Sequence, residues 1–287
     1  MDIHSEIANL NRLFALYEAV ETLDLTAPPT ARLVFPEGAP VPRRVGILCG
    51  SFNPLTLAHT ELAERALTTF ALDAVFFTLA KVTVDKEQIT GMSLEDRLLL
   101  LSLFAERHDK MGVALANRGL YFEQAQAFRT LFGEESALYF LVGMDKLLQI
   151  FDPRYYQDRD AALQQLFAIS SLIVANRGDM DEVNFSQLLD RPENRRFRSH
   201  VQFFTLAAAV TDLSATALRK ALAVGQHIDS QVPPETTAFL TETQAFTPPL
   251  QEGVKGIDVY ARRLALLAQL YAEHSTKRSN PARWTKE

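Results

Sequence analysis

Cysteine is nearly absent from this sequence, which holds only Cys49 in 287 residues. No internal disulfide can form, and no metal cluster can be built from several thiolates. We therefore expect a reducing compartment, the cytoplasm or alternatively the nucleus. The formal net charge of -6 argues against a protein that binds a long run of nucleic-acid phosphates, but it leaves room for a local basic pocket that binds a small phosphorylated ligand.

Long apolar runs are also missing. No stretch approaches the roughly 20 apolar residues of a membrane-spanning helix. The first residues, MDIHSEIANLNRLF, lack the basic and apolar regions of a secretory signal. We expect no membrane partner and no cleaved leader. With 47% apolar residues, the chain can bury one large core.

Composition divides the chain into three parts. Apolar residues recur at helical spacing over the first two dozen residues and predict one amphipathic helix. Five prolines between Thr26 and Pro42 predict an irregular connection after it. A stretch rich in Pro and Gly from Thr247 precedes a last predicted helix and a polar tail. We therefore divide the chain into an N-terminal helix and connection, a main domain, and a C-terminal helix and tail, at residues 1–43, 44–246 and 247–287.

Short apolar runs recur along the main domain. They lie at residues 44–49, 74–80, 113–116, 138–143, 171–175 and 201–206, with helical patterns between them. Strands that are apolar on both faces and alternate with helices are typical of a parallel sheet covered on both sides. The predicted fold is therefore a doubly wound α/β fold.

The first predicted strand ends at Cys49 and is followed by the sequence GSFNPLTLAHT. In open parallel sheets, ligands bind beyond the carboxyl ends of the strands, where free backbone N–H groups and helix N-termini meet. Gly50 allows the backbone to approach a bulky anion, and Ser51 and Asn53 offer side-chain hydrogen bonds. This loop is a candidate phosphate-binding site.

Thr56 and His59 stand three positions apart at the start of the next predicted helix. Residues at this spacing project to one side of a helical turn, so both side chains can face a bound phosphate. The alternative is a threonine that only caps the helix and a histidine that is half-buried at the surface. For an isolated Thr and His at this spacing the alternative is favoured. The surrounding loop sequence instead favours the interpretation that both side chains bind a phosphate.

A second motif, DLSATALR, begins another predicted helix at residues 212–219. A hydroxyl at a helix start caps the helix, while the free N–H groups there bind phosphate oxygens. Ser214 and Thr216 supply hydroxyls, and Arg219 can bind a triphosphate through two N–H bonds. The alternative is an ordinary Ser cap followed by a solvated Arg.

Together the two motifs resemble the nucleotidyltransferase superfamily with the signature H/T-x-G-H, and within it the nicotinamide or nicotinate mononucleotide adenylyltransferases. The first is similar to that family's GSFNP-x-T-x-x-H loop, and the second to its I-S-S-T-x-I-R motif. The resemblance covers about residues 44–243 and implies a Rossmann-like nucleotidyltransferase domain. It implies catalytic roles for Thr56, His59 and Arg219. It also implies nucleotide contacts from Gly50, Ser51, Phe52, Asn53, Ser214 and Thr216.

Two segments between these motifs resemble the family as well. LVGMDKLLQIF is similar to its G-x-D-x-L segment, which implies that Gly143 permits close approach and that Asp145 accepts hydrogen bonds from the ribose of adenosine. IVANRGD is similar to the next strand and loop, which implies that Asn176 and Arg177 lie near the adenine or its phosphates. A buried structural Asp and a solvent-facing Arg are the alternatives.

The acceptor side is less well marked. Lys81 and Lys86 follow the second predicted strand and are candidates for binding the phosphate of the mononucleotide, with solvent-facing lysines as the alternative. Members of the family hold the pyridine ring against aromatic side chains, often tryptophan. The only tryptophan here is Trp284, near the end of the chain, so a Phe or Tyr must take this part or the second substrate differs.

The resemblance implies that the 5′-phosphate of a pyridine mononucleotide attacks the α-phosphorus of ATP, giving NAD or its deamido form and pyrophosphate. A phosphate monoester is largely dianionic at neutral pH, so the reaction needs no general base. Mg²⁺ is implied as a cofactor held mainly by substrate phosphates and water, without metal ligands from the protein.

Two other functions stay open on the sequence alone. The first is another adenylyl- or cytidylyltransferase of the same superfamily, because the loop and the Arg motif serve any nucleoside triphosphate. The second is a non-catalytic nucleotide-binding module whose terminal helices bind a protein partner. The sequence leaves a homo-oligomer open and predicts no nucleic-acid partner.

Overall fold

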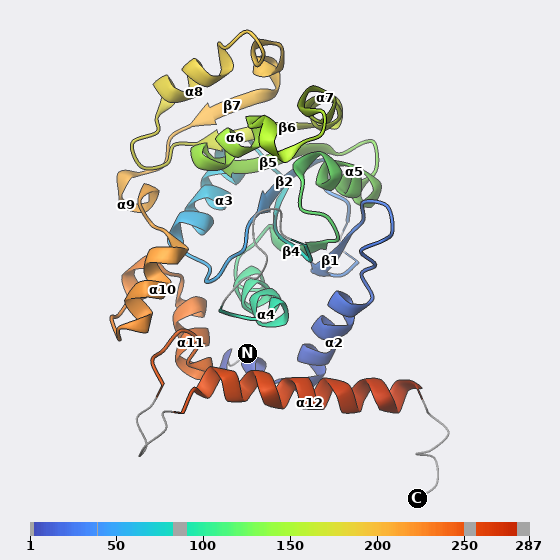
Figure 1. Ribbon diagram of the computed structural model, residues 1–287, viewed down its shortest axis with the longest axis vertical. Helices are drawn as coiled ribbons and strands as arrows, with labels where there is room; N and C mark the ends of the chain where they lie inside the picture. Colours follow the sequence, from blue (N-terminus) through green and yellow to red (C-terminus); the bar gives the residue numbers. More distant parts are fainter. Residues whose placement is uncertain (1–2, 39, 83–90, 250–256, 280–287) are drawn as a thin grey trace, which may run out of the picture.

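The computed structural model describes residues 3–38, 40–82, 91–249 and 257–279, and a seven-stranded sheet forms its centre (Figure 1). The strands are β1 (Ala31–Phe35), β2 (Arg44–Cys49), β3 (Ala74–Ala80), β4 (Met111–Ala116), β5 (Ala137–Gly143), β6 (Ser170–Ala175) and β7 (Val201–Phe204). Each of the six strands predicted from apolar runs is confirmed, with ends that differ from the prediction by two residues at most.

Helices fill most of the connections between the strands. They are α1 (Ile3–Ile7), α2 (Leu10–Glu21), α3 (Leu57–Thr69), α4 (Leu94–Ala105), α5 (Tyr121–Phe132), α6 (Met144–Phe151), α7 (Arg159–Ile169), α8 (Glu182–Leu189), α9 (Ala208–Thr211), α10 (Ala215–Ala223), α11 (Pro234–Thr243) and α12 (Val259–Ser279). Three short 3-10 helices lie at Pro153–Tyr155, Arg195–His200 and Asp229–Gln231. Among the described residues, no helix has the length and apolar character needed to cross a membrane.

The strand order is β1-β4-β3-β2-β5-β6-β7. All neighbouring strands are parallel except β1, which pairs antiparallel with β4 at the edge of the sheet. The chain builds outward from β2 to β3 and β4, and then returns to the other side of β2 to form β5, β6 and β7. The order therefore reverses between β2 and β5, and a doubly wound sheet binds its ligands at such a reversal.

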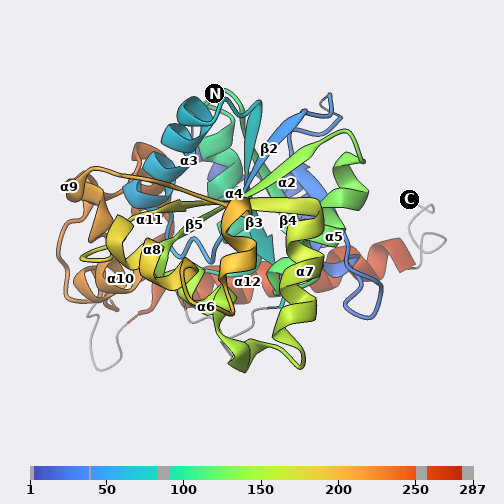
Figure 2. The ribbon, with the colours of Figure 1, turned by 90° about the horizontal axis from the view of Figure 1, so that it is seen from above.

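The sheet separates two apolar cores, because neighbouring residues of a strand point to opposite faces. On β3, Phe77 belongs to a core that also holds residues of α2, α3, α4, α11 and α12, and Phe76 belongs to the core on the other face, which holds residues of α5, α6, α7 and α8. Helices on both sides of the sheet are visible in Figures 1 and 2. The predicted doubly wound α/β fold is confirmed.

The apolar spacing predicts a single N-terminal helix, and this prediction is wrong. The chain forms two helices instead, and Asn9 stands between them. Its side-chain oxygen accepts a hydrogen bond from the backbone N–H of Arg12 at 3.3 Å and so caps α2. An Asn that bonds to a backbone N–H three residues later competes with a continuous helix, and this explains the break.

The irregular connection predicted between Thr26 and Pro42 also needs correction, because β1 lies within it. The prolines flank the strand, at Pro29 and Pro36, and leave its ladder with β4 intact. Proline cannot donate a backbone hydrogen bond, so it is tolerated beside an edge strand but not inside its ladder. The first part of the chain thus contributes a strand to the main sheet.

Candidate active site

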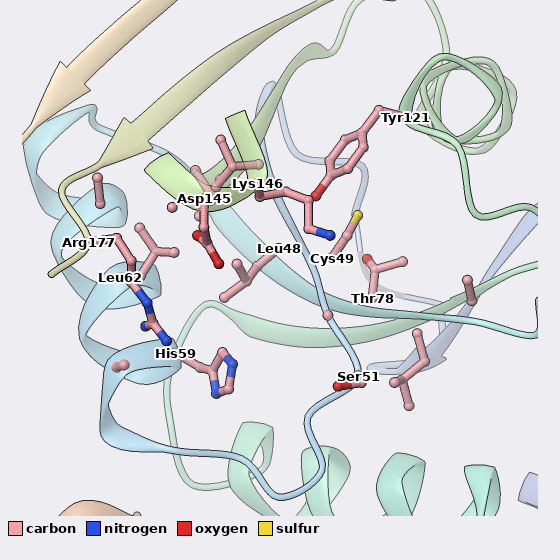
Figure 3. Close-up of a pocket in the computed structure, with 18 of the residues that line it drawn as sticks. Leu48, Cys49, Ser51, His59, Leu62, Thr78, Tyr121, Asp145, Lys146 and Arg177 are labelled. Atoms are coloured by element: carbon pink, nitrogen blue, oxygen red, sulfur yellow. The ribbon is translucent and has the colours of Figure 1, made fainter. Parts of the chain in front are cut away.

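A cavity of about 350 Å³ opens where β2 and β5 end, at the reversal of the strand order (Figure 3). We call it the switch-point cavity. Its walls come from the ends of β2, β3, β5 and β6 and from the first turns of α3 and α6. Seven of the residues predicted to bind the nucleotide line it, namely Gly50, Ser51, His59, Gly143, Asp145, Asn176 and Arg177.

The loop after β2 is shaped by a buried phenylalanine. Phe52 is 1% exposed, has a φ of 42°, and packs edge-on against the rings of Phe77 and His59. A Cβ atom on Gly50 would lie 2.9 Å from Cζ of Phe52, closer than such atoms approach. Gly50 is therefore needed to fit the Phe52 ring under the loop. Phe52 itself supports the loop and does not line the cavity.

His59 is held in one orientation by Thr56. The backbone N–H of Thr56 donates to Nδ1 of His59 at 3.1 Å, and the Thr56 hydroxyl lies 2.9 Å from the same nitrogen. Because Nδ1 accepts a hydrogen bond, the proton of the neutral ring is on Nε2. Thr56 is the N-cap residue of α3, is fully buried and does not line the cavity. It orients His59, so one residue both begins the helix and fixes the imidazole.

The imidazole of His59 stays neutral near pH 7. Burial lowers the pKa of His59 from 6.5 to about 4, and the positive charge of Arg177 acts in the same direction. Figure 3 shows the Arg177 side chain extending toward the His59 ring. The cavity therefore pairs a neutral Nε2–H donor with a guanidinium, an arrangement suited to phosphate oxygens.

Arg219 reaches the loop after β2 from α10. Its Nη1 donates to the backbone oxygen of Asn53 at 2.7 Å, and its Nη2 donates to the hydroxyl of Thr216 at 3.1 Å. Asn53 is buried, and its side-chain oxygen accepts from the N–H of Met92 at 3.1 Å. The two predicted motifs thus meet in space, although they lie far apart in the sequence.

Ser214 is the N-cap residue of α10, but its side chain makes no capping hydrogen bond, and Thr216 is exposed. Arg219, Ser214, Thr216 and Asn53 lie outside the wall of the switch-point cavity. The structure therefore places this group beside the loop, on the α10 side of the cavity.

The segment after β5 places a carboxylate at the cavity. Asp145 lies in the first turn of α6 and is exposed. A Cβ atom on Gly143 would lie 2.7 Å from Oδ1 of Asp145, so a larger residue there would force the carboxylate to move from its present position. Asn176 uses its amide differently, because Oδ1 accepts from the N–H of Leu206 at 2.6 Å and joins the end of β6 to the chain after β7.

Two cations of the cavity wall are absent from the predicted set. Arg97 of α4 is 5% exposed and donates from Nη1 to the backbone oxygen of Ser51 at 3.1 Å. Burial lowers the pKa of Arg97 to about 10, so the guanidinium remains charged at neutral pH. Lys146 follows Asp145 on α6, and its ammonium donates to the side chain of Gln149. Its position directly after Asp145 was the sequence signal that could have identified it.

Lys146 also borders a second, smaller cavity of about 50 Å³. Lys146 and Tyr121 line both cavities, and Tyr155 and Tyr156 line the smaller one. Figure 3 shows Lys146 and Tyr121 on the side of the switch-point cavity away from His59. Aromatic surface and a positive charge therefore meet at this end.

Lys81, one of the two predicted acceptor lysines, does not line the cavity. Lys81 donates from its ammonium to the backbone oxygens of Val20 and Leu23, at 2.7 and 3.1 Å, and so binds the carboxyl end of α2. Lys86 lies outside the described residues. A phosphate-binding role for either lysine stays a prediction.

Known proteins match most of this chain. A probable nicotinate-nucleotide adenylyltransferase of Synechococcus sp. (strain JA-3-3Ab) is 29% identical over 220 residues, which cover 73% of this chain and 98% of the relative. A probable enzyme of the same name from Trichlorobacter lovleyi is 28% identical over 221 residues, covering 71% of this chain and all of the relative.

A solved structure has a similar fold. It is the nicotinic acid mononucleotide adenylyltransferase of Plasmodium falciparum complexed with NaAD, with a TM-score of 0.52 and 14% sequence identity over 70% of this chain and 95% of that one. The family described as cytidylyltransferase-like matches residues 47–221, which hold both motifs and the switch-point cavity. The resemblance drawn from the two motifs is thereby confirmed, and the chain belongs to the cytidylyltransferase-like family.

Proposed function

We propose that this protein transfers the adenylyl group of ATP to a pyridine mononucleotide, with nicotinate mononucleotide as the preferred acceptor and nicotinamide mononucleotide as the other. An oxygen of the acceptor's 5′-phosphate forms a bond to the α-phosphorus of ATP. The bond from that phosphorus to the bridging oxygen breaks, and pyrophosphate leaves with the electron pair. The supporting observation is the set of phosphate-binding groups, His59, Arg97 and Arg177, around one cavity at the β2–β5 reversal.

The ATP half of the site is assigned to the loop after β2. His59 donates from Nε2 to an α-phosphate oxygen, because its other ring nitrogen is occupied by Thr56. Arg177 and Arg97 balance the negative charge of the triphosphate within the cavity, and Arg219 binds the β- and γ-phosphates from α10. Asp145 accepts hydrogen bonds from the adenosine ribose. These groups stabilise charge and fix geometry.

The acceptor half is assigned to the opposite end of the cavity. Tyr155 and Tyr156 supply the aromatic surface on which a pyridine ring stacks. Lys146 lines the same small cavity and is the one positively charged residue of that cavity's wall. A ring that carries a carboxylate gains a charge-assisted hydrogen bond there, whereas a ring that carries an amide does not. This favours the nicotinate form.

The proposed cofactor is Mg²⁺. The described residues contain no group of three or more His, Cys, Asp or Glu side chains arranged to hold a metal ion. Asp145 is a carboxylate at the cavity edge, and a donor set of this kind fits an ion that is bound mostly by phosphate oxygens and water. When bound, Mg²⁺ supplies charge neutralisation for the departing pyrophosphate.

The acceptor panel provides the test. Purified protein, ATP and Mg²⁺ are incubated separately with nicotinate mononucleotide, nicotinamide mononucleotide, phosphopantetheine and choline phosphate, and parallel reactions contain CTP. We expect pyrophosphate and a pyridine dinucleotide to form in the reactions with ATP and not in those with CTP. Adenylylation of another acceptor would assign a different transferase of the superfamily. Binding of ATP without turnover on any acceptor would favour the non-catalytic module.

A further inference from the structure

Asp96 is a buried carboxylate on α4 that receives its partners from the last helix. It is 0% exposed, and Arg263 of α12 donates to it from Nη2 at 2.8 Å and from Nε at 3.3 Å. The hydroxyl of Tyr260, also on α12, donates to Oδ2 of Asp96 at 2.8 Å. A buried charge without such partners is strongly destabilising. Asp96 therefore fixes where α12 can dock.

The same contacts continue toward the cavity. The Tyr260 hydroxyl accepts from the backbone N–H of Ser93 at 2.9 Å. The backbone oxygen of Ser93 accepts from Nε of Arg97 at 3.2 Å, and the Nη1 of Arg97 donates to the backbone oxygen of Ser51 at 3.1 Å. An unbroken series of hydrogen bonds therefore runs from α12 through the start of α4 to the loop after β2.

Figure 1 shows α12 lying across one end of the molecule, below α2 and α4. This helix lies beyond residue 221, where the family match ends. The cavity wall is formed within the matched region, whereas Tyr260, which bonds to the residue whose carbonyl accepts from Arg97, comes from a helix beyond that region.

We infer that Tyr260 and Arg263 are positioning residues for the reaction: by binding Asp96 and Ser93 they fix the first turn of α4, and through Arg97 they hold the Ser51 carbonyl and the loop over the switch-point cavity. The kinetic part of this inference rests on the proposed adenylyl transfer. Arg97 can keep one guanidinium on both Ser93 and Ser51 only while the first turn of α4 stays in place.

The test compares Tyr260→Phe with His274→Ala, a control on the same helix. The first change removes the hydroxyl between Ser93 and Asp96. The second removes a ring that stacks on Phe14 at 4.3 Å and bonds to Glu18 at 2.8 Å, so it loosens α12 without touching Asp96. We expect Tyr260→Phe to lower kcat/KM for ATP about tenfold, and His274→Ala to lower Tm with kcat/KM unchanged.

A double-mutant cycle shows whether Tyr260 acts through Arg97. Arg97→Lys keeps the charge but cannot span two carbonyl oxygens. In that background the effect of Tyr260→Phe on kcat/KM should disappear, since the link is already broken. An equal effect of Tyr260→Phe in both backgrounds overturns the inference, as does an equal loss of activity in His274→Ala.

Amide hydrogen exchange supplies a readout that does not need turnover. Residues 50–56 should exchange faster in Tyr260→Phe than in wild-type protein and His274→Ala, and equal exchange in all three contradicts the inference. A wild-type protein without adenylyl transfer would refute the proposed function and leave this comparison valid. If Tyr260→Phe does not fold, Arg263→Lys, which keeps a positive charge beside Asp96, replaces it in every measurement.

Discussion

The protonation state of His59 gives the fold a pH dependence. Its pKa is about 4 in the folded protein and 6.5 as an ordinary histidine, so the unfolded chain binds a proton at higher pH than the native one. The stability from the neutral ring is complete above pH 6.5 and is lost as the pH falls toward 4. We expect a loss on the order of 2 kcal/mol in the free energy of unfolding between pH 7 and pH 4.5.

His59→Asn separates this contribution from those of other groups, because asparagine can accept the same Thr56 N–H but does not titrate. Urea unfolding at both pH values should show a smaller loss for the variant than for the wild type. Equal losses in the two proteins would mean that His59 titrates normally in the folded state.

Arg219 tests the triphosphate assignment at the level of one side chain. Arg219→Lys keeps the charge but replaces a planar group that spans two acceptors by a point charge. We expect KM for ATP to rise about tenfold, with Tm changed by little. Arg65→Lys, on the exposed surface of α3, is the matched control. Wild-type kinetics in Arg219→Lys would rule out the triphosphate role.

Lys146 tests the acceptor assignment. Lys146→Gln removes the positive charge at the smaller cavity, so kcat/KM for nicotinate mononucleotide should fall about tenfold while the value for nicotinamide mononucleotide stays within a few-fold. Lys110→Gln, outside both cavities, controls for the change in net charge. If kcat/KM falls equally for the two acceptors, Lys146 binds a group that they share, such as the 5′-phosphate.

Among the elements, the loop after β2 depends on the fit between Gly50 and Phe52. Gly50→Ala brings a Cβ atom to 2.9 Å from the Phe52 ring and should displace the loop. We expect a loss of about 1–3 kcal/mol in stability and most of the activity. Adding Phe52→Leu removes the atoms that clash and should restore part of the activity. A Gly50→Ala variant with wild-type kinetics and Tm would show that the loop does not need this fit.

The sequence predicts some elements well and others poorly, for physical reasons. Strands such as β2 and β3 are apolar on both faces, and this pattern is readable without tertiary information. The closeness of Thr56 and His59 is readable because three positions separate them, but Thr56 is buried and does not line the cavity, so the predicted arrangement with both side chains facing a phosphate does not hold for it. The position of Arg97 in the cavity wall could not be predicted. Every residue of α4 from Asp96 to Ala105 is buried, so the apolar pattern does not indicate toward which side any one side chain points.

At the scale of the whole molecule, the doubly wound sheet explains where the site lies. Local patterns predict six of the seven strands, but the strand order, with the reversal between β2 and β5, is fixed only by packing on both faces. The same packing brings Arg219 to Asn53 and α12 to Asp96. Spacing along the chain does not predict such contacts. The motif resemblance indicated that Arg219 lies near the loop, but nothing indicated the contact between α12 and Asp96.

The most direct measurement of the central claim follows the fate of ATP in the presence of nicotinate mononucleotide and Mg²⁺. Chromatography and mass spectrometry of the wild-type reaction should show deamido-NAD and pyrophosphate formed in equal amounts. His59→Ala, with an unchanged melting temperature, should form both about 10² to 10³ times more slowly. Folded wild-type protein that forms no dinucleotide, or a His59→Ala variant that forms it at the wild-type rate, would contradict the account.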